Sequence, residues 1–327
     1  MARAGRILAK TGLLALKILV SASLVAFLLA KVDRSSLFAT LRQMNPSAFL
    51  AAIGLYLGAA FLSTLRWQLL VPHPIGARRL FSMYLIGSFF NNYLPGGVGG
   101  DAVKAYYLSK EMKRYGAGGE DSVLYSSLTG AIASVFMDRY VGLSALIAIS
   151  VAVFPFGIRY LEGASMEWPV IWAIPLIALA FLSVSVLIFT FRVGERVRFL
   201  LNAYRYLHFY RSQRKALLKA FAYSLAIQLL GVLSVYILSK GLHLPLSFLS
   251  LLVFLPMIIL FSMIPVTVSG IGLREGAFVF LLGSTGVSPE SAISLSIVWF
   301  FSVFVAGVWG LLEYLRYKKA VFGGEVQ

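Results

Sequence analysis

The stretch LPGGVGGD at residues 94–101 ends an apolar run and is followed by a second, shorter apolar piece. A related break interrupts a later apolar region, with IP at residues 264–265 and SGIGLRE at residues 269–275. Proline and clustered glycine end helices. The pieces after the breaks are too short to cross a bilayer alone, which takes about 20 residues of helix. Each region is therefore predicted to be a re-entrant helical hairpin, about 79–112 and about 246–284.

The overall composition predicts a membrane protein. The 327 residues are 59% hydrophobic and 13% charged, whereas soluble domains carry about 25% charged residues. A soluble protein, a secreted disulfide scaffold and a disordered chain are thereby excluded. The predicted fold is one polytopic membrane domain, residues 1–327, all-α, with six full transmembrane helices plus the two hairpins. The six apolar runs long enough to span are 12–30, 48–70, 123–154, 168–191, 219–239 and 289–313.

The distribution of charge predicts the topology. Lys and Arg number 29 against 13 Asp and Glu, a net charge of +16. Cytoplasmic loops collect Lys and Arg, so the excess needs no nucleic acid partner. With the N-terminus inside, most basic loop residues fall on the inner side. The chain is predicted to be a multi-pass protein of the cell (cytoplasmic) membrane with both termini cytoplasmic.

In this topology the two hairpins enter the membrane from opposite sides. The first half, residues 1–154, holds the hairpin that enters from the cytoplasm. The second half, residues 219–313, holds the hairpin that enters from outside. Paired Gly/Pro-interrupted segments in corresponding positions are typical of transporters built on inverted repeats. The sequence therefore predicts an inverted repeat.

The basic segment 192–219 is not expected to span the membrane. It carries apolar residues at helical spacing among eight Lys and Arg side chains. One interpretation is a cytoplasmic interfacial helix that lies on anionic lipid. The other is a loop that only sets topology.

The glycine-rich breaks are predicted to bind an anionic lipid headgroup. Unwound backbone exposes N–H groups, and each half-helix directs its positive end at the break, so both attract phosphate or carboxylate. Charges inside apolar segments are costly and mark functional candidates. The predicted headgroup-binding residues are Gly96, Gly97, Gly99, Gly100, Asp101, Lys104, Asp138, Arg139, Gly270, Gly272, Arg274 and Glu275.

Some of these residues have a structural alternative. Asp101 is equally suited to cap a helix. Asp138, paired with Arg139 or Arg274, would hold helices in register.

Three residues outside the predicted site are assigned structural roles. Arg66, near the inner end of the second span, is expected to extend its charge to the inner interface. Gly54 and Gly58 are four residues apart, a spacing that favours close helix packing.

Several function classes lack the residues they need. The chain has no cysteine and three scattered histidines, so thiol catalysis, disulfides and a metal site are not expected. No Gly-Lys-Ser/Thr follows the glycine cluster, which is therefore not a nucleotide P-loop. We expect no cofactor and no enzymatic activity.

Three stretches together resemble a known family: NNYLPGGVGGD at 91–101, DRYVGL at 138–143, and residues 264–276. In this order they are similar to the lysylphosphatidylglycerol synthase transmembrane-region family, also called the flippase-like or UPF0104 membrane family. The resemblance implies a membrane fold that moves a lipid or lipid-linked headgroup between leaflets. Family members that synthesise lipid carry a cytosolic domain after the membrane part. The chain stops at Gln327, so transferase activity is expected to be missing.

The chain departs from the family pattern at two places. Lys104 stands where an arginine is common, which weakens bidentate phosphate binding there. The polar stretch 110–121 is also longer than usual, and we assign it no role.

Two functions remain open from sequence. The first is a flippase-like transporter in which the two halves rock around a headgroup site. The alternative is a non-transporting membrane partner that recruits or stabilises a lipid-modifying enzyme or glycosyltransferase, with segment 192–219 as its docking surface. An intramembrane enzyme is disfavoured because no catalytic constellation is present. The sequence assigns no oligomeric state.

Overall fold

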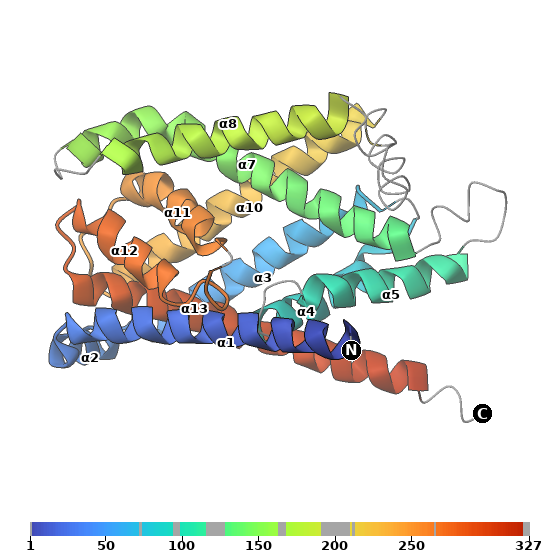
Figure 1. Cartoon of the computed structure of the whole chain (residues 1–327), viewed down its shortest axis with the longest axis horizontal. Coiled ribbons are helices and arrows are strands. Elements are labelled where there is room, and N and C mark those ends of the chain that lie inside the picture. The colour runs from blue at the N-terminus through green and yellow to red at the C-terminus, as the bar shows by residue number, and fades with distance from the viewer. Residues whose placement is uncertain are drawn as a thin grey trace.

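The computed structural model describes residues 2–71, 74–93, 99–115, 128–162, 168–190, 210, 213–264 and 266–322 (Figure 1). Every regular element in these ranges is an α-helix, which confirms the all-α prediction. The helices are α1 (Ala2–Ala30), α2 (Arg34–Arg42), α3 (Pro46–Gln68), α4 (Ala77–Tyr93), α5 (Gly99–Tyr115), α7 (Leu128–Glu162), α8 (Trp168–Thr190), α10 (Arg214–Gly241), α11 (Phe248–Ser262), α12 (Leu273–Gly283) and α13 (Pro289–Phe322).

Four helices in the described part of the chain are long and apolar enough to cross a membrane. They are α3, the Leu128–Gly157 part of α7, α10, and the Pro289–Tyr317 part of α13. They coincide with four of the six predicted spans. The protein is thus an all-helical membrane protein with several apolar helices, as its composition predicts.

The other two predicted spans are not confirmed. Helix α1 meets the spanning criterion only together with α2, from which it is bent by 94°. The bend has a local cause, because Asp33 caps α2 by accepting the N–H groups of Ser35 and Ser36. In α8 the apolar helix within the described residues is the shorter stretch Pro175–Leu187.

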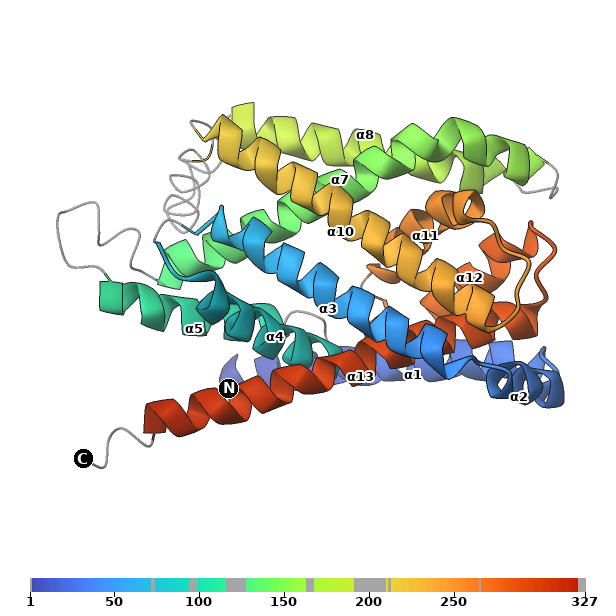
Figure 2. The same cartoon turned by 180° about the vertical axis from the view of Figure 1, so that it is seen from behind.

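Helices α3 and α10 form an antiparallel pair that defines the two ends of the bundle. The Asn45 N–H donates to the Gly241 carbonyl at 3.0 Å where α3 begins and α10 ends. At the opposite end the Tyr210 hydroxyl donates to the Leu70 carbonyl. We call these the Gly241 end and the Tyr210 end. The start of α1 and the end of α13 both lie toward the Tyr210 end (Figures 1 and 2).

Helices α4 and α5 form a hairpin that opens at the Tyr210 end. Arg79 near the start of α4 pairs with Glu111 near the end of α5 at 3.1 Å. The two helices nearly touch at Gly87 and Gly100, where a Cβ built on Gly100 would lie 1.8 Å from the Gly87 carbonyl oxygen. Only glycine permits this approach. Gly99 and Gly100, predicted as unwound backbone, are thus the first residues of α5, while Gly96 and Gly97 lie outside the described residues.

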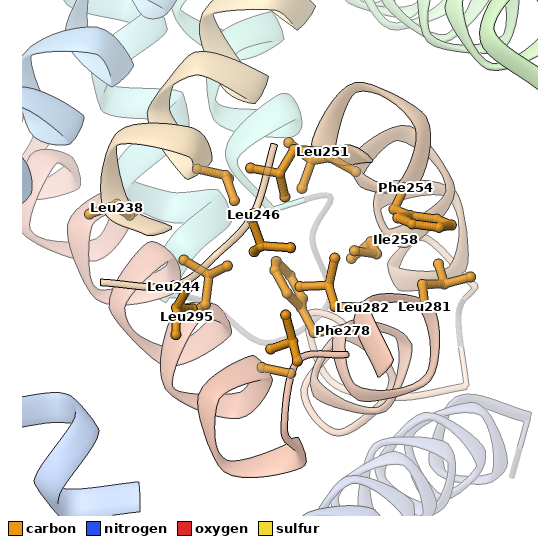
Figure 3. Packing of buried hydrophobic residues seen from close by; sticks show 14 of the residues in the cluster. Leu238, Leu244, Leu246, Leu251, Phe254, Ile258, Phe278, Leu281, Leu282 and Leu295 are labelled. Atoms are coloured by element: carbon orange, nitrogen blue, oxygen red, sulfur yellow. The ribbon is translucent and has the colours of Figure 1, made fainter. Parts of the chain in front are cut away.

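Helices α11 and α12 form a second hairpin, which opens at the Gly241 end. The loop before α11 is held there because the Lys240 ammonium donates to the Leu246 carbonyl at 2.8 Å. Figure 3 shows the apolar core that fixes this hairpin against α10 and α13. Its labelled side chains are Leu238, Leu244, Leu246, Leu251, Phe254, Ile258, Phe278, Leu281, Leu282 and Leu295.

Helix α13 joins the inner ends of both hairpins. The Tyr93 hydroxyl, at the end of α4, donates to the Phe304 carbonyl at 2.9 Å. The Arg274 guanidinium, in the first turn of α12, donates to the Ser296 hydroxyl at 3.1 Å. The two chain breaks therefore approach the same central part of α13 from opposite ends of the bundle.

Two structural expectations from sequence are corrected here. A Cβ on Gly54 or Gly58 would meet no atom of the described residues within 4 Å, so this pair is no packing motif among them. Close backbone packing is found instead at Gly87 and Gly100, and at Gly310, where a Cβ would lie 2.1 Å from the Leu85 carbonyl oxygen. Helix α10 begins at Arg214, inside the predicted interfacial helix 192–219, most of which lies outside the described residues.

The glycine contact gives a direct test of the first hairpin. Gly100→Ala forces a Cβ into the Gly87 carbonyl, so we expect a loss of about 1–3 kcal/mol in the free energy of unfolding. Gly58→Ala is the matched control, since the site is open and alanine favours helix by about 1 kcal/mol. Unfolding of the purified protein in mixed micelles measures both. Equal stability of the two variants would contradict this packing.

Candidate functional site

A cavity of about 540 Å³ lies between the two hairpins. Its size falls within the range of about 300–1,000 Å³ that is usual for small-molecule sites. Helices α3, α4, α7, α10, α11, α12 and α13 all contribute to its wall. The polar and aromatic lining residues are Tyr56, Ser63, Tyr84, Ser88, Asn91, Asn92, Arg139, Gln228, Ser234, Ser262, Ser269, Arg274, Trp299 and Phe300.

The charged groups in this wall are two arginines. Arg139 comes from α7 and Arg274 from α12. No carboxylate is among the described residues that line the cavity. Arginine presents a planar fork of donors that suits phosphate and carboxylate oxygens. The cavity is therefore chemically suited to an anion.

Arg139 is oriented by the first hairpin. Its Nη2 and Nε donate to the two Asp101 carboxylate oxygens at 2.8 and 3.0 Å, and just over half of the Arg139 side chain is exposed. Asn91 supports this pair, because its amide donates to Asp101 at 3.3 Å while its carbonyl accepts the Gly100 N–H at 2.9 Å. Asp101 thus positions Arg139, and the Gly100 N–H is already satisfied.

Arg274 is oriented by the second hairpin. Its Nη2 donates to Glu275 at 2.6 Å, and its guanidinium lies 4.5 Å from the centre of the Phe300 ring. Glu275 also accepts the Gly272 N–H at 2.7 Å and so caps α12. Gly272 has φ +88°, a left-handed conformation that glycine adopts without strain. Gly270 shares that conformation, with φ +77°.

A buried ionic cluster lies beside the cavity. Asp138 accepts from Arg66 Nε at 2.8 Å and from Lys104 Nζ at 3.3 Å, and all three side chains are at least nine-tenths buried. Arg66 also donates to Ser224 at 3.1 Å. Because one carboxylate faces two cations, the cluster carries one net positive charge.

Lys104 is enclosed on its other faces as well. Its ammonium lies 4.3 Å from the ring centres of both Trp67 and Tyr84. A Cβ on Gly87 would meet the Lys104 Cγ at 2.3 Å, so the bare glycine makes room for the lysine stem. Lys104 and Asp138 do not line the cavity, unlike the predicted ligands Arg139 and Arg274.

The location of Arg66 also differs from the one predicted from the sequence. The sequence favours a charge that reaches the inner interface, but Arg66 is buried and paired with Asp138. The cost of burying either charge alone drives this pairing. Asp138 thus pairs with neither Arg139 nor Arg274, the partners considered from sequence.

Several cavity residues carry no signal that a sequence could reveal. Asn92, Gln228 and Trp299 lie in apolar helices where single neutral residues are unremarkable. The Nδ2 of Asn92 is buried, although the residue itself lines the cavity. It lies near the Tyr56 hydroxyl and against Gly307 of α13. Its position beside the first break, at 91–101, is the nearest available sequence clue.

Comparison with known proteins covers most of the chain. A family model described as the lysylphosphatidylglycerol synthase TM region matches residues 14–310. A UPF0104 membrane protein from Methanothermobacter thermautotrophicus is 25% identical over 292 residues, which is 79% of this chain and 81% of that relative. The family match includes both hairpins and every residue that lines the cavity.

The buried cluster predicts unequal effects of two similar substitutions. Asp138→Asn leaves Arg66 and Lys104 buried without a counter-charge, so we expect a loss of about 3–5 kcal/mol in unfolding free energy. Asp101→Asn breaks a pair with an exposed partner and should cost less than about 1 kcal/mol. Unfolding in mixed micelles tests both, and a mild Asp138→Asn variant would refute the role of the cluster.

Proposed function

This chain belongs to the lysylphosphatidylglycerol synthase TM-region family, and we propose that it moves the phosphate-bearing headgroup of a membrane lipid between leaflets. The headgroup would occupy the cavity that Arg139 and Arg274 line, while the hydrocarbon tail stays in the bilayer. The lipid is a phospholipid or a lipid-linked headgroup.

One observation carries the proposal: two arginines, each held by a different hairpin, line one cavity whose described lining residues include no carboxylate. Guanidinium groups among apolar helices are costly and are retained where they serve a pathway or ligand. Every phospholipid carries a phosphate, and this anionic group is the one that would enter the cavity. The two arginines supply bidentate donors for its oxygens.

Both arginines are held in position before a ligand arrives. Asp101 holds Arg139, and Glu275 holds Arg274. Neither carboxylate lines the cavity, and each balances the charge of its arginine. A fixed side chain loses little entropy when a ligand binds. The Asp138 cluster beside them leaves one net positive charge, which a singly charged phosphodiester would neutralise.

We infer that the two hairpins are re-entrant and enter the membrane from opposite sides. Their open ends lie at opposite ends of the bundle, and their inner ends both contact α13. Irregular backbone within a membrane is stable only when buried in protein or lining a cavity. Rocking of one hairpin against the other would expose the cavity to each side in turn.

We infer further that the Tyr210 end is cytoplasmic. Basic residues gather there, among them Arg79, Arg214, Lys215 and Arg316, and cytoplasmic loops favour such residues. Both chain termini would then face the cytoplasm.

Headgroup transport predicts a specific loss of activity. We expect Arg139→Gln and Arg274→Gln each to slow lipid movement about tenfold or more, since a charged hydrogen bond contributes roughly 1.5–3 kcal/mol. Proteoliposomes with fluorescent phosphatidylglycerol, quenched from outside, measure the rate. Arg316→Gln is the control, because Arg316 is exposed and far from the cavity lining. Full activity in both cavity variants would defeat the proposal.

Topology can be tested with two matched cysteine variants, because the chain has no cysteine. Gln43→Cys lies at the Gly241 end and should react with an impermeant maleimide in intact cells. Gln213→Cys lies at the Tyr210 end and should react only after permeabilisation. Both side chains are exposed. The reverse labelling pattern would invert the proposed orientation.

A further inference from the structure

Helix α1 lies at the edge of the bundle and covers the turn before α12 (Figure 1). The Val268 N–H in this turn donates to the Ser21 hydroxyl oxygen at 2.9 Å. One helical turn further along α1, Leu24 packs on Gly272, where a Cβ would lie 2.6 Å from the Leu24 Cβ. Irregular backbone is stable inside a membrane only when protein covers it or it lines a cavity. Helix α1 would therefore shield this turn from lipid.

The same turn separates α1 from the cavity. Ser269, which follows Val268, lines the cavity and is exposed. Met263, just after α11, also lines the cavity and is 58% exposed. The rim of the cavity and the contact with Ser21 are thus made by consecutive residues of one turn. A crevice between α1 and the second hairpin would join the cavity to the bilayer.

A lysine in the middle of α1 lies beside this turn. Lys17 is roughly 20 Å from either end of the 29-residue helix, since an α-helix rises about 1.5 Å per residue. Ser21 and Leu24 lie one and two turns further along, on the same face of α1 as Lys17. No described residue forms a hydrogen bond, ion pair or cation–π contact with the Lys17 ammonium. A charge inside an apolar helix is costly and marks a candidate functional position.

Helix α1 is packed only lightly around Lys17. The neighbouring side chains Leu16, Ile18 and Leu19 are each more than half exposed. Ser21 is the next buried residue along the helix. Separating this part of α1 from the second hairpin therefore breaks few of the described contacts.

A lipid phosphate has the chemistry that such a crevice requires. When Ser21 moves away, the Val268 N–H loses its acceptor, and an unpaired N–H in apolar surroundings is costly. Phosphate oxygens accept hydrogen bonds from backbone N–H groups and from the ammonium of a lysine such as Lys17. An acyl chain can satisfy neither donor.

We propose that the lipid enters and leaves the cavity sideways, between α1 and the second hairpin, and that Lys17 binds its phosphate during this passage. The headgroup then passes Ser269 to reach Arg139 and Arg274, while the acyl chains stay in the bilayer. This inference rests on the proposed function, to which it adds a lateral route and a phosphate-binding residue outside the cavity.

Substitution of Lys17 tests its role as a phosphate ligand. In the proteoliposome assay with fluorescent phosphatidylglycerol, Lys17→Met should slow lipid movement about tenfold. Lys17→Arg keeps the charge and should retain most of the rate. Lys31→Met is the matched control, because Lys31 is exposed just beyond the end of α1 and lies 4.5 Å from the centre of the Phe27 ring. A wild-type rate in Lys17→Met would overturn the inference.

The thermal unfolding midpoint of the same variants separates ligand binding from a structural role. Lys17 has no partner among the described residues, so Lys17→Met should unfold at the wild-type temperature in detergent. A slowed variant with a lowered midpoint would show that the lysine stabilises the fold, and this would also overturn the inference.

A disulfide across the crevice tests the route itself. Ser21→Cys with Val268→Cys joins α1 to the turn, and the chain has no other cysteine. Oxidation should slow lipid movement about tenfold or more, and a reductant should restore it. Ser82→Cys with Glu313→Cys is the control pair. Ser82 donates to Glu313, and α4 and α13 pack closely at Gly310, so these helices need not separate.

The outcomes distinguish the route from the proposed function. Full lipid movement through the oxidised bridge between positions 21 and 268 would overturn the inference and leave the proposed function standing. Absence of lipid movement by the wild-type chain would overturn the proposed function, and the inference with it. If the pair does not form a disulfide, the rate of Lys17→Met decides.

Discussion

The arrangement of this bundle depends on one buried carboxylate that is shared by two cations. Asp138 on α7 binds Arg66 on α3 and Lys104 on α5, and Arg66 reaches Ser224 on α10. Removing three charges from water carries a large penalty that only mutual pairing offsets. Four helices must therefore keep their relative positions for the ions to stay paired. Glycines make this geometry possible, since a Cβ on Gly87 would collide with the Lys104 stem.

The burial of Asp138 in this cluster also explains why Arg139, the next residue along the helix, reaches the cavity. Consecutive helical side chains point in directions about 100° apart, so Asp138 is buried while Arg139 lines the open space. Arg139 is then held by Asp101 from the first hairpin, as Arg274 is held by Glu275 in the second. Both arginines are thus fixed by carboxylates that do not line the cavity. Their donors would face a bound ligand without a competing negative charge among the described residues of the wall.

The two hairpins contribute in different ways. The first packs its helices almost backbone to backbone at Gly87 and Gly100, so α5 is helical from its first glycines. The second keeps an irregular turn before α12, with left-handed backbone at Gly270 and Gly272 and a cap from Glu275. The proposed anion binding is therefore better attributed to side chains than to unwound glycine backbone, because the described N–H groups of Gly100 and Gly272 are already bonded.

The sequence by itself determined the class of protein and the location of its breaks. Apolar composition, the Pro and Gly clusters and the few charges inside apolar segments are local properties of the sequence. They predict helices, two interrupted regions, and Arg139 and Arg274 as candidate site residues. Tertiary structure alone decided which charges pair, at which positions close packing requires glycine, and which neutral residues, such as Asn92, line the cavity together. The bend at Asp33 and the burial of Arg66 are likewise evident only from the tertiary structure. Pairing and burial depend on distances between residues far apart in the chain, and helical packing sets those distances while local periodicity does not.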